Sequence, residues 1–279
     1  MQRFYFTDGT TTLELQYVIE CAGLNMPPIE LTSTRGFGQD GFSVHSVAYG
    51  ARPFSILFDV RGASAAAAMA ERRAVSAFFG TKTAKRFIYE ADTFDVYLKD
   101  VYIAGAYETG AKEKRVLNGT LQFIAASPLF RRDIPFSSAA LETALKEYPA
   151  SGLEYVDGGI EFSTAQDGIT VINGGSVDSP AVLRMVGPAN QPYIENETTG
   201  ERIEVNREIV AGEYIEMSTE TGLVEIVEAD GTRHSAFNYV QDDFQFIHYA
   251  PGANVLRFGS AGGVLGWIEA GGVEHFSGI

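Results

Sequence analysis

The sequence predicts a mainly β protein of two domains, with one α-helix in the first domain. Three observations carry this prediction. The chain has 30 glycines together with 19 Phe and 13 Tyr residues, which favours turns and strands over helices. Its 279 residues are 45% hydrophobic and 20% charged, a globular composition long enough for two ordinary domains. Its second half consists of short alternating runs separated by turn dipeptides, which is typical of an antiparallel sandwich.

The first half contains several segments with the alternation of a half-buried strand. In residues 54–61 the apolar side chains of Phe54, Ile56, Phe58 and Val60 share one face, because successive side chains of a strand point to opposite sides. Further strands are predicted at residues 86–91, 94–107 and 115–126, with a hairpin turn at Thr109-Gly110.

One segment has the pattern of a helix, residues 64–79. Ser64 is placed to cap the first N–H groups, the following alanines favour the helix, and Gly80 suits a left-handed residue at its end. The buried stripe of the helix is expected to hold Ala68, Val75 and Phe79. Residues 32–41, rich in Ser, Thr and Gly, are interpreted as a long loop.

A change of composition marks the expected domain boundary. Residues 129–152 include Arg131-Arg132, Pro135 and Pro149, with only a weak helical patch, which indicates a connector. We therefore expect an N-terminal domain at residues 1–130, a linker at 131–152 and a C-terminal domain at 153–279.

Turn signals recur throughout the second half, and no helix is evident there. The alternating pairs between them include Ile215 with Met217, Val224 with Ile226, and Phe244 with Phe246. The turn dipeptides are Asp157-Gly158, Asp167-Gly168, Asn173-Gly174, Thr199-Gly200, Thr221-Gly222 and Asp230-Gly231.

The net charge of -15 lies entirely in the second half. Residues 1–150 hold 16 acids and 16 Lys or Arg, whereas residues 151–279 hold 20 acids, 5 Arg and no Lys. An acidic chain lacks the cations that nucleic-acid binding requires, although an acidic surface can also serve solubility alone. Cys21 is the only cysteine, so no intrachain disulfide is expected. We expect no signal peptide and no transmembrane helix.

Two motifs suggest ligand sites only weakly. Gly36–Gly41 matches G-x-G-x-x-G, but a dinucleotide site needs a helix after the glycines, and residues 42–50 alternate instead. A flexible glycine loop is therefore the preferred interpretation. The four histidines lack metal-ligand spacing; they are His45, His234, His248 and His275.

Two further features are candidate ligand sites. Asp242-Asp243 could bind Ca²⁺ only if a loop bends there, because adjacent strand residues point to opposite faces. Trp267, the only tryptophan, is either a platform for stacking a sugar ring or part of the core, and burial habits favour the core. With no nucleophile elbow and no acid/base pair, we expect no catalytic, cofactor-binding or metal-binding residues.

A series of motifs in order resembles a known family. In the second half it consists of Asn173-Gly174-Gly175, Ser179-Pro180 before the strand Ala181–Gly187, Asn196, Thr199-Gly200, Ala211–Met217 and Pro251–Leu256. In the first half it consists of the strand Phe54–Arg61, the helix after it, and the strands Asp95–Tyr107 and Leu117–Ser127 closing at Pro128. Over nearly its whole length the chain resembles the distal tail proteins of long non-contractile-tailed phages.

This resemblance implies a structural virion protein at the tail tip, assembled in the cytoplasm of the host bacterium. The N-terminal domain, a β-sheet or barrel with one helix, would form a hexameric ring on the tail tube protein. The C-terminal domain would be a galectin-like antiparallel β-sandwich. It would join the ring to the tail-associated hub or lysin protein and to receptor-binding or adhesion proteins of the baseplate. The resemblance brings no catalytic residues, and the protein is expected not to be an enzyme.

Two alternatives stay open from the residues. The sandwich could be a carbohydrate-binding domain that recognises host cell-wall glycans, since a galectin-like fold by itself does not decide this. A hydrolase is the weaker alternative, because no acid/base pair or nucleophile constellation is visible. A neutral first half closes into a ring more easily than a charged one, and residues 32–50 could form an arm that reaches a neighbouring subunit.

Overall fold

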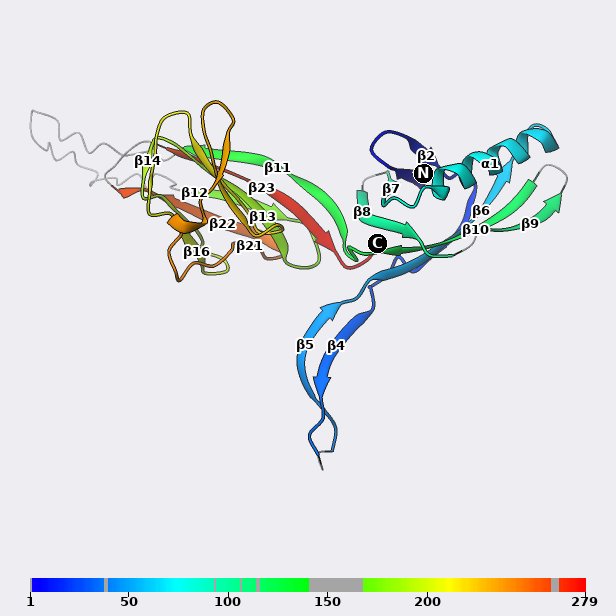
Figure 1. The fold of residues 1–279 in the computed structure, drawn as a ribbon, viewed down its shortest axis with the longest axis horizontal. Helices are drawn as coiled ribbons and strands as arrows, with labels where there is room; N and C mark the ends of the chain where they lie inside the picture. The colour runs from blue at the N-terminus through cyan, green and yellow to red at the C-terminus, as the bar shows by residue number, and fades with distance from the viewer. Residues whose placement is uncertain are drawn as a thin grey trace, which may run out of the picture. The chain divides into compact units, whose positions relative to one another are not determined.

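The computed structural model describes residues 2–37, 40–92, 94–105, 107–113, 116–140, 168–261 and 266–279. It divides into two compact units, of which unit 1 comprises Met1–Arg132 with His275–Ile279 and unit 2 comprises Asp133–Glu274. The last five residues therefore return to unit 1. Of the expected linker, residues 141–152 lie outside the described residues. Figure 1 shows the elements of both units.

Unit 1 is an antiparallel β domain with one helix, as expected. Its elements are β1 (Arg3–Thr7), β2 (Thr12–Glu14), β3 (Val18–Ala22), β4 (Ile29–Thr34), β5 (Ser43–Tyr49), β6 (Arg52–Arg61), α1 (Ala65–Gly80), β7 (Lys85–Ala91), β8 (Phe94–Ile103), β9 (Glu108–Glu113), β10 (Val116–Ala125) and the start of β11 (Phe130–Ala140).

Two groups of strands build the sheet of unit 1. Strands β2, β1, β7 and β8 are neighbours in that order, and β10 pairs with β6, β8 and β9. Strand β6 pairs with β10 along its whole length, from Arg52 opposite Ala125 to Arg61 opposite Val116. The predicted alternation of β6 is confirmed, because its apolar side chains from Phe54 to Val60 are buried.

Helix α1 closes unit 1 and begins where its sequence predicts. The Ser64 hydroxyl accepts a hydrogen bond from the N–H of Ala67 at 3.1 Å, and the buried residues are the predicted Ala68, Val75 and Phe79. One detail was wrong: Gly80 is the last residue of the helix and Thr81 caps it in an extended conformation. After this extended cap, a connection of residues 81–84 leads to β7.

A cluster of phenylalanines forms the centre of this core. The ring centroids of Phe6 and Phe123 lie 4.7 Å apart and those of Phe54 and Phe123 lie 5.0 Å apart. Phe79 of the helix meets Phe6 edge-on at 5.0 Å. Because these rings come from β1, β6, β10 and α1, the aromatic cluster fastens the helix to the sheet.

Unit 2 is composed of short strands. They are the rest of β11, β12 (Gly168–Asn173), β13 (Ser179–Val186), β14 (Ala189–Asn190), β15 (Tyr193–Asn196), β16 (Glu201–Glu204), β17 (Glu208–Ile209), β18 (Tyr214–Ser218), β19 (Leu223–Val227), β20 (Arg233–Ser235), the 3-10 turn η1 (Phe237–Tyr239), β21 (His248–Tyr249), β22 (Gly252–Gly259) and β23 (Trp267–Phe276).

Two sheets enclose the core of unit 2. Strands β23, β13, β18, β19 and β20 are successive neighbours in one, and β12, β22, β15 and β16 form the other. Met185, Ile215 and Ile268 from the first sheet belong to the same buried cluster as Ile194 and Leu256 from the second. The predicted antiparallel sandwich is confirmed, because strands such as β13, β18 and β22 alternate between this core and the outside.

Glycine turns connect the strands of the sandwich where the dipeptides predict them. Gly222 between β18 and β19 has φ 66, and Gly231 between β19 and β20 has φ 86. Both values lie in the left-handed region that glycine adopts at little steric cost. The turns at residues 157–158 and 167 lie outside the described residues.

Four local expectations were wrong. Thr109 and Gly110 lie inside β9, where Gly110 pairs with Asn118 of β10, because pairing continues past the expected turn. Residues 130–140, largely assigned to the linker, form β11. Residues 32–34 belong to β4 rather than to a loop. Phe244 and Phe246 lie outside the strands, in a segment that still packs against the core.

Candidate interaction surfaces

The first candidate surface is the hairpin of β4 and β5, which projects from the rest of unit 1 (Figure 1). All thirteen residues of its two strands are exposed. Ile29 lies opposite Tyr49, and Leu31 lies opposite Val47. Because directly opposed residues share a face, these four apolar side chains form one stripe, which we call the apolar stripe.

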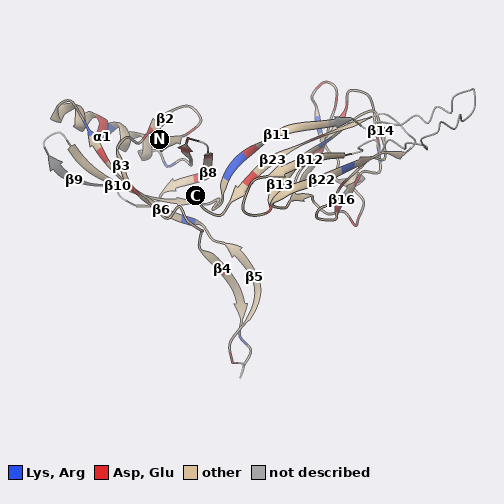
Figure 2. Cartoon of the chain, turned by 180° about the vertical axis from the view of Figure 1, so that it is seen from behind, with Lys and Arg blue, Asp and Glu red and all other residues tan. Residues whose placement is uncertain are grey.

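The hairpin has few of the charged side chains that normally protect exposed strand edges in water. Glu30 is the only Lys, Arg, Asp or Glu in β4 and β5, and Figure 2 shows both strands almost entirely tan. Leu31 is 52% exposed and Val47 is 64% exposed. A two-stranded hairpin is at best marginally stable alone, and its two open edges invite further pairing. The apolar stripe therefore has the properties of a surface that another molecule covers.

The sequence predicts an arm in this region but not the form that the arm takes. The composition of residues 32–41 indicates a loop, whereas the structure has strands on both sides of the glycines. The alternation of Ile29 with Leu31 and of Val47 with Tyr49 was the signal for strands. The G-x-G-x-x-G motif joins β4 to β5, and the strand β5 stands where a dinucleotide site needs a helix.

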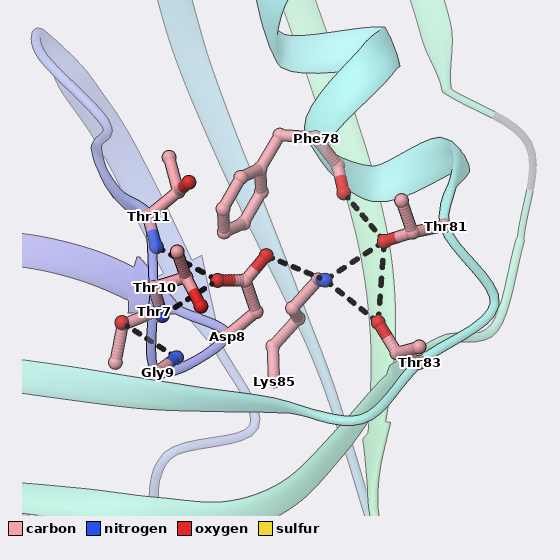
Figure 3. Close-up of polar contacts among 9 residues, drawn as sticks. All are labelled: Thr7, Asp8, Gly9, Thr10, Thr11, Phe78, Thr81, Thr83 and Lys85. Atoms are coloured by element: carbon pink, nitrogen blue, oxygen red, sulfur yellow. Dashed lines mark hydrogen bonds and ion pairs between the residues drawn. The ribbon is translucent and has the colours of Figure 1, made fainter.

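A buried lysine fixes the end of the helix to the β1–β2 turn (Figure 3). The Lys85 Nζ donates hydrogen bonds of 2.8 Å to the hydroxyls of Thr81 and Thr83 and lies 3.4 Å from Asp8 Oδ2. The same ammonium lies 4.9 Å from the ring centroid of Phe78. The ammonium is thus directed at three oxygen acceptors from two segments, which makes Lys85 a structural connection between them.

Asp8 completes this connection from the other side. Its Oδ1 accepts hydrogen bonds from the backbone N–H groups of Thr11 and Thr10 at 2.8 and 3.0 Å. These bonds, assisted by Lys85, hold the pKa of Asp8 below its ordinary value. The carboxylate therefore stays charged and shapes the turn (Figure 3).

A second buried cation of unit 1 has only carbonyl oxygens as hydrogen-bond acceptors. Arg52 is fully buried, and its guanidinium donates to the carbonyls of Pro128 at 2.6 Å, Ser277 at 2.7 Å and Gly23 at 3.3 Å. It also donates to the carbonyl of Asn25. Burial lowers the pKa of Arg52 to about 10, so it stays protonated at neutral pH. Three distant segments of the chain are joined through this one side chain.

The outer face of the sheet that contains β13 and β18 carries a row of ion pairs in unit 2. Arg184 Nε lies 2.7 Å from Glu216 and its Nη1 lies 3.1 Å from Glu269. Arg233 lies 2.8 Å from Glu216 and 2.9 Å from Glu225. The row thus crosses β23, β13, β18, β19 and β20. Burial raises the pKa of Glu216, but hydrogen bonds from Arg233 and Arg184 outweigh it, and the net pKa is lowered.

Trp267 lies on this outer face, and its expected place in the core was wrong. It is 39% exposed, whereas Ile268 and Ala270 are fully buried. Trp267 begins β23 opposite Val186, so the alternation of the strand decides its direction. A flat aromatic side chain is therefore open to solvent at this position.

The remaining candidate residues do not come together. The described residues contain no group of three or more His, Cys, Asp or Glu side chains that could hold a metal ion. His248 lies 3.2 Å from Glu201, His234 lies 3.3 Å from Glu228, and His45 contacts Thr34. Burial raises the pKa of Cys21 to about 12, which makes its thiol a poor nucleophile at neutral pH. No helix in the described ranges is long and apolar enough to span a membrane.

Comparison with known proteins agrees with the family that the ordered motifs suggested. Residues 174–269 match the family model of the siphovirus-type tail component, C-terminal domain. This part of unit 2 is thus similar to that domain, and the resemblance stated from the sequence is confirmed. No curated protein sequence is significantly similar to the chain.

Solved structures extend the likeness to the whole fold. The crystal structure of SPP1 Dit, described as a paradigm of hub adsorption apparatus in Gram-positive infecting phages, matches with a TM-score of 0.65 at 13% identity and covers 98% of this chain and 99% of that chain. Chains of the phage p2 baseplate in its activated conformation, with Sr and with Ca, match over their full lengths with TM-scores of 0.50 and 0.51 at 12% identity. At these identities the likeness concerns the fold.

Proposed function

We propose that this chain is the distal tail hub of a phage with a long non-contractile tail. Six copies of unit 1 would close into a ring on the tail tube, and unit 2 would attach the tail-tip hub or lysin and the receptor-binding or adhesion proteins. The role is structural, without catalysis, nucleic-acid binding or membrane insertion, at the tip of a virion assembled in the host cytoplasm. Its support is the tail-component domain in residues 174–269 and the full-length fold likeness to SPP1 Dit.

The apolar stripe of the hairpin carries the ring proposal. Ile29, Leu31, Val47 and Tyr49 share one face, and nothing in the described part of their own chain buries them. Covering such a stripe stabilises an association by about 25 cal/mol per Å² of apolar surface removed from water. In a closed ring, the neighbouring copy of this chain would cover the apolar stripe of every hairpin in the same way.

Paired charges on either face of the hairpin test this proposal. Leu31→Glu with Val47→Glu places two carboxylates in the apolar stripe, whereas Thr32→Glu with Ser46→Glu places the same charges on the opposite face. Both pairs stand directly opposite each other, so the repulsion within the hairpin is matched. We expect the first variant to run as a monomer and the second to keep its ring, measured by light scattering and electron microscopy.

Two outcomes would contradict different parts of this proposal. A wild-type protein that stays monomeric at high concentration would contradict ring formation outright. Equal loss of assembly in both variants would contradict the role of the apolar stripe. Circular dichroism of each variant shows whether unit 1 is still folded.

The exposure of Trp267 favours a second candidate function, the binding of host cell-wall glycans by unit 2. A flat aromatic surface beside Arg184 and Glu269 offers both a stacking face and polar groups for hydroxyls. Since Trp267 is the only tryptophan, titrating the protein with purified cell-wall polysaccharide reports directly on this site through its fluorescence. A spectral shift with saturation, and loss of glycan binding in Trp267→Ala, would support this function; an unchanged spectrum would exclude it for that polysaccharide.

A further inference from the structure

A segment between β20 and β21 presents aromatic rings at the surface of unit 2. We call residues 236–247 the aromatic loop. The ring of Phe237 meets that of Phe244 edge-on, with the centroids 5.4 Å apart. The rings of Phe244 and Phe246 also meet edge-on, at 5.3 Å. Phe244 and Phe246 pack against the core, whereas Phe237 is 46% exposed. The ladder therefore leads from the core out to a ring in solvent.

The backbone of the aromatic loop is held in place along its length. The N–H of Gln241 donates to the carbonyl of Glu204 at 3.2 Å, and the N–H of Gln245 donates to that of Arg202 at 2.9 Å. Asn206 donates in turn to the carbonyl of Tyr239 at 2.8 Å. Since the loop is ordered by β16 and the residues after it, little conformational entropy is lost when a partner binds.

The charges of the loop define what it can attract. Asp242 and Asp243 are exposed, and neither forms an ion pair within the described residues. The two arginines in and just after β16 already form ion pairs. Arg202 lies 2.6 Å from Glu204, and Arg207 lies 3.5 Å from Glu213. Phe237 contacts Phe244, which directly follows these two exposed carboxylates in the chain. An aromatic face and carboxylates both attract cations.

The chain itself shows that cations stack on rings in this region. The guanidinium carbon of Arg207 lies 5.4 Å from the ring centroid of Tyr239, and that of Arg202 lies 4.0 Å from the ring of Tyr193. The five arginines of residues 168–261 all form ion pairs within the chain. A basic partner therefore meets no competing free arginine in this range.

We propose that the aromatic loop is the docking surface for a cationic segment of another protein. Its Lys or Arg side chains would lie on Phe237 and pair with Asp242 and Asp243. This inference rests on the proposed role of unit 2 as the attachment domain of the tail hub and specifies the chemistry of its partner. Aromatic rings and pairs of charges are common at such contacts.

Fluorescence anisotropy with the full-length protein tests this surface. The probe is a dye-labelled peptide rich in arginine and leucine, and its counterpart carries glutamate in place of arginine. We expect binding of the first peptide only. Phe237→Ala should weaken it about three- to tenfold, and Asp242→Asn with Asp243→Asn by a similar factor that shrinks as salt is added.

A matched charge control separates the loop from the general acidity of unit 2. Asp178→Asn with Glu220→Gln removes two exposed carboxylates elsewhere in the unit, and we expect it to change the affinity less than twofold. Equal weakening by both double variants, or no effect of Phe237→Ala, would overturn the proposal, as would failure of the arginine peptide to bind. Circular dichroism checks that each variant is folded.

Measuring the mass of the same samples keeps this test independent of the tail-hub proposal. If the wild-type protein forms rings but does not bind the peptide, the docking surface is wrong and the hub role stands. If it binds the peptide but never assembles, the hub role is wrong and the docking surface stands as a property of unit 2.

Discussion

The two units differ in how their best-anchored cations are held. In unit 1, Arg52 and Lys85 are buried and donate to carbonyl and hydroxyl oxygens inside the fold. In unit 2, Arg184 and Arg233 lie on the outer face of a sheet and pair with glutamates of neighbouring strands. A buried cation connects segments and is costly to lose, whereas an exposed ion pair in water contributes little.

The hydrophobic cores of the two units also differ in the kind of side chain that fills them. Nine phenylalanines are buried in unit 1, where large rings fill the space between a curved set of strands and the helix. Among the described residues of unit 2, the buried ones are mostly aliphatic, with Tyr249 and Phe258 as the aromatic members. Side chains of moderate size fit the separation of about 10 Å between two packed sheets.

The largest expected effect comes from removing the buried guanidinium of unit 1. Arg52→Met leaves four carbonyl oxygens without their donor, so we expect the free energy of unfolding to fall by roughly 3–5 kcal/mol. Arg202→Met, which removes a half-exposed arginine of unit 2, should cost no more than about 1 kcal/mol. Chemical denaturation measures both, and similar losses would erase the contrast between the units.

A smaller loss is expected at the second buried cation. Lys85→Met keeps the approximate length of the side chain but leaves Asp8, Thr81 and Thr83 without their donor. We therefore expect the free energy of unfolding to fall by about 1–3 kcal/mol. Lys82→Met, at an exposed position three residues earlier, is the control and should leave the melting temperature nearly unchanged. Equal melting temperatures of the two variants would show that the Lys85 contacts drawn in Figure 3 do not stabilise the fold.

The smallest effect is expected in the ion-pair row of unit 2, and it depends on pH. Because the folded-state pKa of Glu216 lies below its ordinary value of 4.5, its contribution is present above that value and is lost as pH falls through the lower folded value. Glu216→Gln should therefore cost about 1 kcal/mol at neutral pH and progressively less in acid. Glu208→Gln, at an exposed position of the same unit, serves as the control, and a pH-independent difference would argue against the ionic contribution.

Local patterns predicted a large part of the fold. The alternation of β6, the capped helix with its buried stripe and the glycine turns of the sandwich all depend on residues close together in the chain. The misplaced features were those that depend on distant partners. Strand β9 continues through Thr109-Gly110 because β10 pairs with it, and Phe244 and Phe246 pack on the core without strand pairing.

The candidate surfaces were harder to foresee than the fold. The glycine-rich segment around the G-x-G-x-x-G motif pointed to an arm, but its apolar stripe follows from the register of β4 with β5. Trp267 looked like a core residue from its apolar neighbours, and its direction follows from the register of β23 with β13.

The sequence by itself determined the mainly β class, the helix of unit 1, the placement of all net charge in the second half and the resemblance to phage tail proteins, because composition, periodicity and ordered motifs are local properties of the chain. Only the tertiary structure decided which cations are buried, that the last five residues return to unit 1, and which rings and apolar side chains stay in solvent. These outcomes depend on strand register and on contacts between segments far apart in the chain, and a local pattern carries no information about either.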